Sequence, residues 1–445
     1  MVLGEPRDVT QGEFANGRGV LLQQPGQNPV DNRSGIGRHR AILADRLIQA
    51  ASPPSSSLSV TPLGLPGAPG EGASVTDKGL REVVAAETRL SDIDGIGGRL
   101  WYVGYDIHDL APNATFEETV YLLHELRLPT QRDLDELNEF LVSEREVSKF
   151  LAGMMPTLAQ QTSPMSMLRT SVSAASAYDP DGWDNSFEAN HRKALRLIAK
   201  TPTLIAMYHR LRTGQDLIAP HPKLPHAANF LWMLRGEEPE QEDARAFDAT
   251  LVLYGDHGMN ASTFTARVIA STLSDMFSAI TGAIAALKGP LHGGANEEAM
   301  KMLEEVGEPS RAEAYIKDKL TRREKVMGFG HAVYKTMDPR ATHLRRIAKE
   351  LGERRGDTRW YEISAEVERV VREEKGLFPN VDFYAASVYH HLGIPTDLMT
   401  PVFALARMAG WTAHVREQHA ENKLIRPESE YIGPRDQAWI PLEDR

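Results

Sequence analysis

The chain has no cysteine in its 445 residues. This absence excludes disulfide bonds, thiolate nucleophiles and cysteine-based zinc sites, and it is compatible with a reducing cytoplasm, where we expect the protein to work. The sequence also lacks any run that approaches the roughly 18 apolar residues of a membrane span. Acidic residues occur as early as Glu5, Asp8 and Glu13, so the start of the chain does not match a signal or transit peptide.

An excess of positive charge is missing as well. The chain has 61 Asp plus Glu against 50 Lys plus Arg, which gives a formal net charge of -11. This balance disfavours a nucleic acid or an anionic membrane as the main partner, but it leaves room for a local basic pocket that binds an anionic substrate. The sequence contains no HExxH zinc motif and no Gly-x-Ser-x-Gly nucleophile turn. We therefore expect neither a metal nor a bound cofactor.

Residues 1–75 differ in composition from the rest of the chain. They contain no Lys and are rich in Gly and Pro, as in the run SPPSSS at 52–57. Such a segment buries too little apolar area to offset the conformational entropy that is lost on folding. We expect a mostly disordered extension.

The ordered part is expected to be mainly α-helical, with a small β-hairpin at its start. The range 83–105 is rich in β-branched and aromatic residues and is broken by Asp94-Gly95 and Gly97-Gly98, as in an antiparallel hairpin.

Helical spacing of apolar residues follows the hairpin. Two capping-box signatures mark helix starts: Thr115 with Glu118, and Thr130 with Asp133. Periodicity continues through 195–212 and 243–254. The run 263–287 is apolar on nearly all sides and predicts a single buried helix.

Short Gly-rich segments that each hold a His, Asp or Arg begin at Gly255. They are GDHGMN (255–260), GPLHGGAN (289–296), GFGH (328–331), which continues to DPR (338–340), and FPNVD (378–382), together with Arg407 and Arg426.

His292 follows a predicted buried helix and precedes a new helical run. The positive end of a helix dipole disfavours imidazolium, and a neutral His can polarise a carbonyl group by donating a hydrogen bond. A His that only caps or packs remains the other interpretation. His331 follows glycines that would let backbone amides approach a ligand, but a plain turn explains the same pattern.

Asp382 is the single carboxylate of an apolar run. Burial raises the pKa of a carboxyl group and makes it a candidate general base, while a helix cap or a buried ion pair is the competing interpretation. Arg340, Arg407 and Arg426 could be ordinary surface charges. Arg407 lies in an apolar run, however, so its charge needs an anionic partner, and guanidinium groups bind carboxylates in a bidentate way. From the residues alone, the prediction stops at carbon-acid or acyl-transfer chemistry on an anionic substrate.

Taken in order, these segments resemble the citrate synthase family. The resemblance covers roughly residues 79–435 and leaves the extension outside. Its most specific stretches are GPLHGGANE (289–297), GFGHAVYKTMDPR (328–340), FPNVDFY (378–384) and RPESEYIGP (426–434).

The resemblance implies a mainly α-helical homodimer with two domains per chain. A large domain would comprise 76–295 plus 397–445, and a small domain, 296–396, would carry the CoA site and the catalytic Asp. The implied activity is the condensation of acetyl-CoA with oxaloacetate and the hydrolysis of citryl-CoA to citrate and CoA, the first step of the tricarboxylic acid cycle.

Residue roles follow from the same resemblance. His292 would donate to the carbonyl oxygen of acetyl-CoA, Asp382 would remove a methyl proton, and His331 would polarise the ketone of oxaloacetate. The implied ligands of oxaloacetate and citrate are His257, Asn260, Arg340, Arg407 and, from the partner subunit, Arg426. The implied CoA contacts are Val326, Met327, Gly328, Phe329, Gly330, Lys335 and Lys375.

The sequence departs from the family pattern at two places that bear on substrate preference. Gly258 stands where the family usually has Glu, and Ser163 stands where many relatives have His. The nearest alternative is 2-methylcitrate synthase, which uses propionyl-CoA, because one methylene changes binding by only about 1–3 kcal/mol. A non-catalytic paralogue is a second alternative, against which the joint presence of His292, His331 and Asp382 argues.

Overall fold

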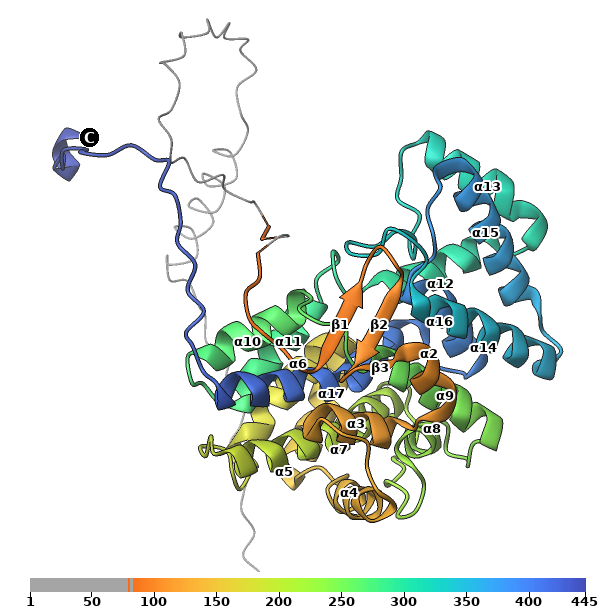
Figure 1. Ribbon diagram of the computed structural model, residues 1–445, viewed down its shortest axis with the longest axis horizontal. Helices are drawn as coiled ribbons and strands as arrows, with labels where there is room; N and C mark the ends of the chain where they lie inside the picture. Colours follow the sequence, from red (N-terminus) through yellow and green to blue (C-terminus); the bar gives the residue numbers. More distant parts are fainter. Residues whose placement is uncertain (1–78, 81–82) are drawn as a thin grey trace, which may run out of the picture. The chain divides into compact units, whose positions relative to one another are not determined.

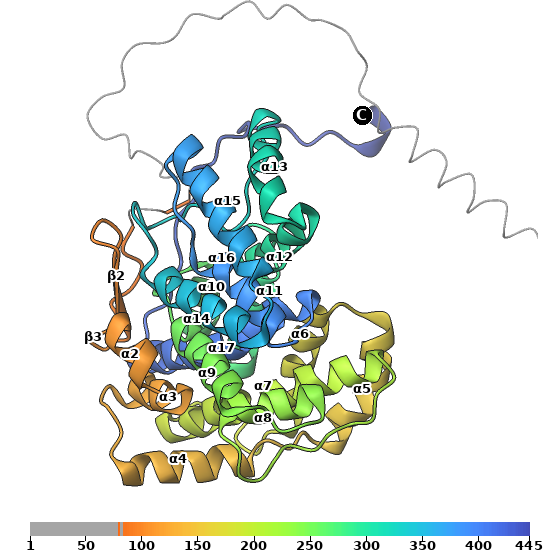
Figure 2. The same ribbon diagram turned by 90° about the vertical axis from the view of Figure 1, so that its right-hand side faces the viewer.

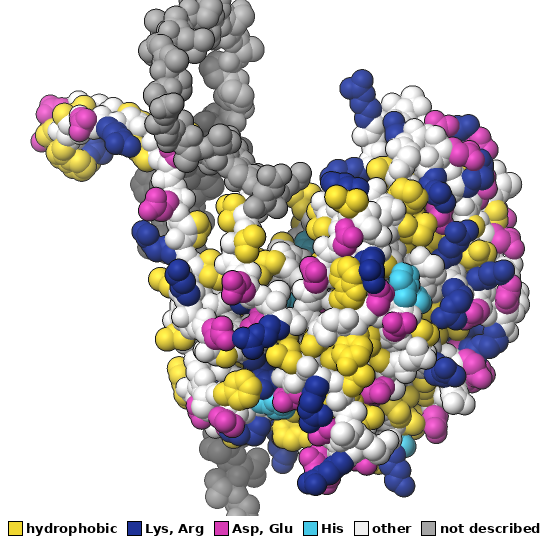
Figure 3. Space-filling view, viewed as in Figure 1, with side chains coloured by type: hydrophobic (Ala, Val, Ile, Leu, Met, Phe, Trp, Pro, Cys, Tyr) yellow, Lys and Arg dark blue, Asp and Glu magenta, His cyan; other side chains and the backbone are white. Residues whose placement is uncertain are grey.

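The computed structural model describes residues 79–80 and 83–445, so the predicted disordered extension, residues 1–75, lies outside the described residues. The described part is mainly α-helical, as the sequence predicts, and carries a small three-stranded sheet (Figure 1). Within these ranges no helix combines the length and the apolar character needed to cross a bilayer. On the face seen in Figure 3, acidic and basic side chains are interspersed.

The sheet confirms the predicted hairpin and extends it by one short strand. Its strands are β1 (Ser91–Asp94), β2 (Arg99–Tyr102) and β3 (Tyr105–Asp106), antiparallel in the order β1-β2-β3. Leu100 and Tyr102 are buried on one face. The Tyr102 hydroxyl donates a hydrogen bond of 2.8 Å to the carbonyl of Asp256, which ties the sheet to the loop after α9.

Eight α-helices and one 3-10 turn follow the sheet in chain order before the first of the Gly-rich connections. They are α2 (Ile107–Asn113), α3 (Phe116–Glu125), α4 (Gln131–Ser143), α5 (Lys149–Gln161), α6 (Pro164–Ala175), a 3-10 turn η1 (Ser176–Tyr178), α7 (Phe187–Arg212), α8 (His226–Arg235) and α9 (Gln241–Tyr254). Both predicted capping boxes are confirmed. At the start of α3, the Glu118 carboxylate accepts from the Thr115 backbone N–H at 2.7 Å, and the Thr115 hydroxyl accepts from the Glu118 N–H at 3.2 Å.

The single buried helix predicted over 263–287 is wrong, because the structure has two helices there, α10 (Ala261–Ser271) and α11 (Met276–Leu287). Leu273 between them has a φ of 63°, which a helix cannot contain. The Asp275 side chain caps α11 by accepting from the Ser278 N–H at 3.0 Å. Both helices face the core, so apolar residues continue across the break and the sequence pattern gives no sign of a helix end there.

The remaining helices are α12 (Ala295–Val306), α13 (Pro309–Thr321), α14 (Pro339–Arg355), α15 (Arg359–Lys375), α16 (Val381–His391), a 3-10 turn η2 (Thr396–Leu398), α17 (Met399–Ala420) and a 3-10 turn η3 (Leu442–Asp444). Helices α12 to α16 pack mainly against one another and form a group of their own in Figures 1 and 2. Helix α17 is buried along most of its length and packs against α3, α7, α9, α10 and α11. It therefore presents Arg407 from the centre of the core.

Candidate active site

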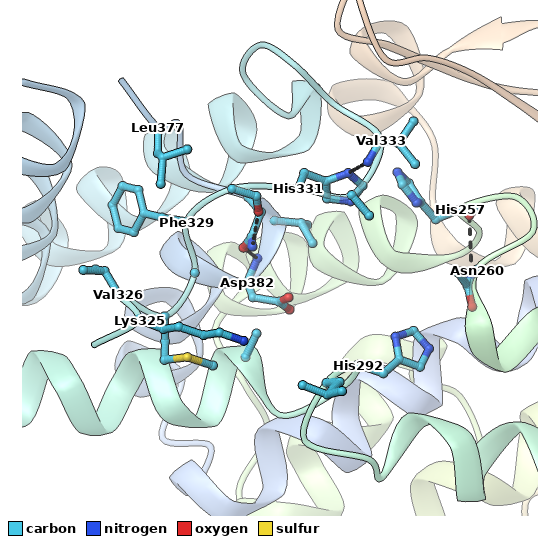
Figure 4. A pocket seen from close by; sticks show the side chains of 18 of the residues that line it. His257, Asn260, His292, Lys325, Val326, Phe329, His331, Val333, Leu377 and Asp382 are labelled. Atoms are coloured by element: carbon cyan, nitrogen blue, oxygen red, sulfur yellow. Dashed lines mark hydrogen bonds between the residues drawn. The ribbon is translucent and has the colours of Figure 1, made fainter. Parts of the chain in front are cut away.

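A cavity of about 1090 Å³ brings the predicted segments together. Its walls come from β1, the loop after α9, the loop between α11 and α12, the segment 320–333, the start of α16 and side chains of α17. Figure 4 shows His257, His292, His331 and Asp382 around this one space, although they belong to four separate segments.

His331 lies in the loop that precedes α14. Its Nδ1 accepts hydrogen bonds from the backbone N–H groups of Val333, at 3.0 Å, and Tyr334, at 3.1 Å. Because Nδ1 is an acceptor, the single proton of the neutral ring lies on Nε2. Burial, assisted by the charge of Arg340, lowers the pKa of His331 to about 4. At neutral pH the ring is thus an uncharged donor with a defined tautomer.

His292 lies between α11 and α12, as the sequence predicts. The backbone N–H of Ser262 donates to its Nε2 at 3.3 Å, and the Ser262 hydroxyl lies 2.8 Å from the same nitrogen. A backbone N–H can only donate, so Nε2 accepts and the proton of the neutral ring lies on Nδ1. Burial, with a smaller contribution from Arg407, lowers the pKa of His292 to about 4. The sequence attributed a neutral ring to a helix terminus, whereas burial is the main cause here.

His257 follows α9 and is buried next to His331. The two ring centroids are 5.2 Å apart in an edge-on arrangement, and the Nε2 of His257 lies 3.2 Å from the Tyr334 hydroxyl. Burial, with the charge of Arg340, keeps the pKa of His257 well below its usual value. Two neutral imidazole rings therefore share one wall of the cavity.

Arg340 starts α14 and is held by the carboxylate of Asp338, which is also the N-cap of that helix. Its Nε and one terminal nitrogen donate to the two carboxylate oxygens at 2.9 and 2.8 Å. The same carboxylate accepts from the backbone N–H of Val381 at 3.2 Å. Asp338 thereby connects the guanidinium of Arg340 to the first residue of α16, next to Asp382.

Arg407 is 1% exposed on α17. Its Nε donates to the carbonyl of Tyr254 at 2.7 Å, and its guanidinium lies 4.7 Å from the centre of the Phe403 ring. In the described part of the chain, no carboxylate lies within ion-pair distance of Arg407. Burial lowers the pKa of this guanidinium, yet it stays charged, since arginine cannot be deprotonated in proteins. The cavity therefore contains one buried cation with no carboxylate in direct contact, and the charge of Asp256 acts on it from a longer distance.

Asp382 occupies the first turn of α16, and its carboxylate accepts a hydrogen bond from the Tyr254 hydroxyl at 3.0 Å. Asn380 caps the same helix by accepting from the Asp382 N–H at 3.0 Å. The side chain borders the cavity and is half-buried. Burial raises the pKa of Asp382 to about 6, as the apolar run in the sequence predicts. No Lys or Arg forms an ion pair with it among the described residues, so the competing interpretation of a buried ion pair is excluded.

Most of the predicted CoA contacts line the same cavity. Those that do are Val326, Met327, Gly328, Phe329, Gly330 and Lys375. Lys335 does not line it, because its side chain is exposed and its backbone N–H donates to the Gly95 carbonyl at 2.8 Å. Arg426 is exposed in the segment after α17 and does not line the cavity of its own chain.

Asn260 borders the cavity, but its side chain also caps α10. The amide oxygen accepts from the backbone N–H groups of Ser262 and Thr263, both at 3.1 Å.

The two departures from the family pattern lie in different places. Gly258 has a φ of 55° and lies beside His257, whereas Ser163 is the N-cap of α6 and lines a different hollow.

Four residues with direct roles in this geometry escaped the sequence prediction: Tyr254, Ser262, Tyr334 and Asp338. Each lies within five residues of a predicted one, so proximity was the available signal. Several of their contacts join distant segments, such as Tyr254 with Asp382, and no local pattern encodes these contacts. Lys325 was also missed and lines the cavity next to the predicted Val326 (Figure 4).

The arrangement combines one carboxylate of raised pKa, two neutral histidines of defined tautomer and two buried guanidinium groups. A carboxylate whose pKa is near neutral can remove a weakly acidic proton. The histidine donors can stabilise oxygen atoms that gain negative charge, and the guanidinium groups can bind carboxylates. In the ranges 79–80 and 83–445 no group of three or more His, Asp or Glu is arranged to hold a metal ion.

Comparison with known proteins agrees with this chemistry. The family model described as "Citrate synthase, C-terminal domain" matches residues 79–428. "Citrate synthase 2" of Bacillus subtilis is 50% identical over 83% of this chain and 99% of its own length. "Citrate/2-methylcitrate synthase" of the same organism is 44% identical over 81% and 97%. The crystal structure of citrate synthase from Pyrobaculum aerophilum superposes with a TM-score of 0.78 at 40% identity, covering 82% of this chain and 95% of that one.

Proposed function

The chain belongs to the citrate synthase family and is an acyltransferase of that type, and we propose that His292, His331 and Asp382 carry its reaction. The reaction joins the methyl carbon of acetyl-CoA to the ketone carbon of oxaloacetate, and hydrolysis of the resulting thioester gives citrate and CoA. The observation that supports these roles best is the convergence of the three side chains on one cavity with complementary protonation states.

In the first step, Asp382 takes a proton from the methyl group of acetyl-CoA. A thioester methyl proton is too weakly acidic for a carboxylate alone, so the thioester oxygen needs a donor as it gains charge. Nδ1–H of His292 is that donor. Preorganised donors of this kind contribute about 2.7–4 kcal/mol each.

In the second step, the enol carbon attacks the ketone carbon of oxaloacetate. His331 donates its Nε2–H to the ketone oxygen, which becomes the hydroxyl of the product. Arg340 and Arg407 hold the carboxylates, with His257 and Asn260 as further ligands. The substrate is a dianion, and one of its carboxylates would form the ion pair that the buried guanidinium of Arg407 does not make within the chain.

The residues along the segment 326–330, with Lys375, are proposed to bind CoA. They form the part of the cavity wall on the side of Asp382 and Phe329 in Figure 4. Lys325 is added to this set because it lines the same wall and carries a positive charge. A contact between Lys335 and CoA stays a prediction, and it would require the Lys335 side chain to turn toward the ligand.

Domain closure and dimer formation complete the proposal. The small domain, 296–396, would close on the large domain, 76–295 plus 397–445, and exclude water until the thioester has formed. Packing of α12 to α16 mainly on one another supports this division. In a cytoplasmic homodimer, Arg426 would reach the cavity of the partner subunit, which is consistent with its exposure here.

The first test is the release of free CoA thiol from acetyl-CoA, with and without oxaloacetate. Because the protein has no cysteine, a thiol-reactive dye has no background from the enzyme. Release that depends on oxaloacetate and is faster with acetyl-CoA than with propionyl-CoA is the expected result. Faster release with propionyl-CoA would favour 2-methylcitrate synthase activity, and no release with either would contradict the proposal.

The pH dependence of the reaction gives a second prediction. Above about pH 6, Asp382 is ionised and both histidines are neutral, which is the active combination. We expect kcat/KM for acetyl-CoA to be constant above about pH 7 and to fall toward a limit of about tenfold per pH unit below about pH 6. The measurement is a pH–rate profile with the fold monitored by circular dichroism. A falling limb centred near pH 4 instead would point away from Asp382 as the base.

A further inference from the structure

The β1–β2 hairpin contacts both loops that carry the histidines of the ketone site. His257 lies in the loop after α9, and His331 lies in the loop before α14. Figure 1 shows the orange turn between β1 and β2 beside the teal loop that leads into α14. The inference that follows rests on the proposed function, because it assigns a role in positioning the oxaloacetate ligands.

The start of β1 holds the His257 loop. The Ser91 hydroxyl donates to the Asp256 carboxylate at 2.5 Å and accepts from the Gly258 backbone N–H at 3.1 Å. These two partners are the residues on either side of His257. One serine thus fixes the backbone around this ring.

The tip of the hairpin holds the His331 loop. The carbonyl of Gly95 accepts from the Lys335 N–H at 2.8 Å. A methyl group at Gly95 would come within 2.5 Å of the Val333 carbonyl oxygen, so the two backbones are in direct contact. Val333 also provides one of the N–H groups that fix the tautomer of His331. The tip therefore touches the residue that orients this ring.

Ile93 lies between these two contacts and faces the cavity. It lines the cavity, and its Cδ1 is 3.3 Å from the point where Gly258 would carry a Cβ. From Ser91 to Gly95 the extended chain spans roughly 13 Å, at about 3.3 Å per residue. A paired strand of this length has little freedom to stretch, since β1 is hydrogen-bonded to β2 along Ser91–Asp94.

We propose that the β1–β2 hairpin fixes the distance between the loop that carries His257 and the loop that carries His331. Ser91 and Gly95 are then positioning residues for the ketone substrate. Both loops must present their rings to one small molecule at the same time. The hairpin is the element that touches each of them, at opposite ends of one strand.

The decisive variant is Gly95→Ala, in which the added methyl group must displace the Val333 backbone. Gly95 lies at a partly exposed tip, so the fold should survive. The matched control is Gly153→Ala on α5, where a methyl group would meet nothing within 4 Å. We expect Gly95→Ala to lower kcat/KM for oxaloacetate roughly 10- to 100-fold, mainly through KM, with a smaller change in KM for acetyl-CoA. Gly153→Ala should keep wild-type values.

Hydrogen exchange measured by mass spectrometry on the full-length protein without substrates gives a readout that does not depend on activity. Gly95→Ala should speed exchange in the segment 331–337, and Ser91→Ala should speed it in 256–260. Wild-type exchange in both segments, or faster exchange with an unchanged KM for oxaloacetate, would overturn the inference. If the wild-type protein releases no CoA, the proposed function fails, while the exchange experiment still decides whether the hairpin holds the loops.

Discussion

Replacement of Asp382 by asparagine is expected to lower turnover sharply and to stabilise the folded protein at the same time. The amide cannot accept the methyl proton of acetyl-CoA, so kcat should fall by roughly 100- to 10,000-fold. Ligands of oxaloacetate lie on other segments, and its affinity should be largely retained. Isothermal titration calorimetry and CoA release measure these two quantities separately.

The gain in stability follows from the pKa of Asp382, which burial raises from 3.8 to about 6. Below pH 3.8 the group is protonated in both the folded and the unfolded state and contributes no difference. As the pH rises through about 6, the folded protein must hold a buried charge that the unfolded chain holds in water. At about 1.4 kcal/mol per pKa unit, the cost above pH 6 is at most about 3 kcal/mol.

Urea unfolding therefore should show Asp382→Asn as more stable than the wild type at pH 8 and similar to it near pH 4. The matched control is Asp318→Asn, the same change at an exposed position on α13, which should alter neither activity nor stability by more than about 0.5 kcal/mol. Loss of stability at pH 8, or loss of oxaloacetate binding together with turnover, would mean that the carboxylate is structural.

Removal of the two histidine donors is expected to have large but different effects. In His292→Ala, kcat should fall by roughly 100- to 1,000-fold with oxaloacetate affinity unchanged, because this ring serves the thioester oxygen. In His331→Ala, a similar fall in kcat should be accompanied by weaker oxaloacetate binding, because this ring serves the ketone.

Calorimetric titration of oxaloacetate into each variant separates the two roles. The control is His390→Ala, which removes a histidine at the C-terminal end of α16 that packs against Trp360 with tilted rings and does not line the cavity. It should keep both kcat and affinity. Equal loss of oxaloacetate affinity in His292→Ala and His331→Ala would contradict the assignment of one ring to each carbonyl group.

The sequence predicted the helical class, both capping boxes, the hairpin and most of the residues that meet at the cavity. These features depend on local chemistry. Thr115 with Glu118 satisfies backbone groups within one turn, and the apolar neighbours of Asp382 raise its pKa wherever the helix packs. The resemblance to one family then supplied the order of the segments.

Other features were beyond a sequence-based prediction because they depend on contacts between distant residues. The tautomer of His331 follows from a turn of its own loop, but that of His292 follows from Ser262, 30 positions away. The break at Leu273 was hidden because burial on both sides erased the polar face that normally marks a helix end. Lys335 was assigned by position, yet its backbone N–H is bonded to the Gly95 carbonyl and its side chain is exposed.

The buried guanidinium of Arg407 also has a thermodynamic consequence. A cation enclosed by protein with no carboxylate in direct contact lowers the stability of the unliganded fold, and a dicarboxylate that binds beside it offsets this loss. By mass action, the melting temperature should then climb with the logarithm of free substrate concentration above its dissociation constant. Metabolite supply would thus set the lifetime of the enzyme in the cell as well as its rate, because chains without substrate unfold and are degraded more readily.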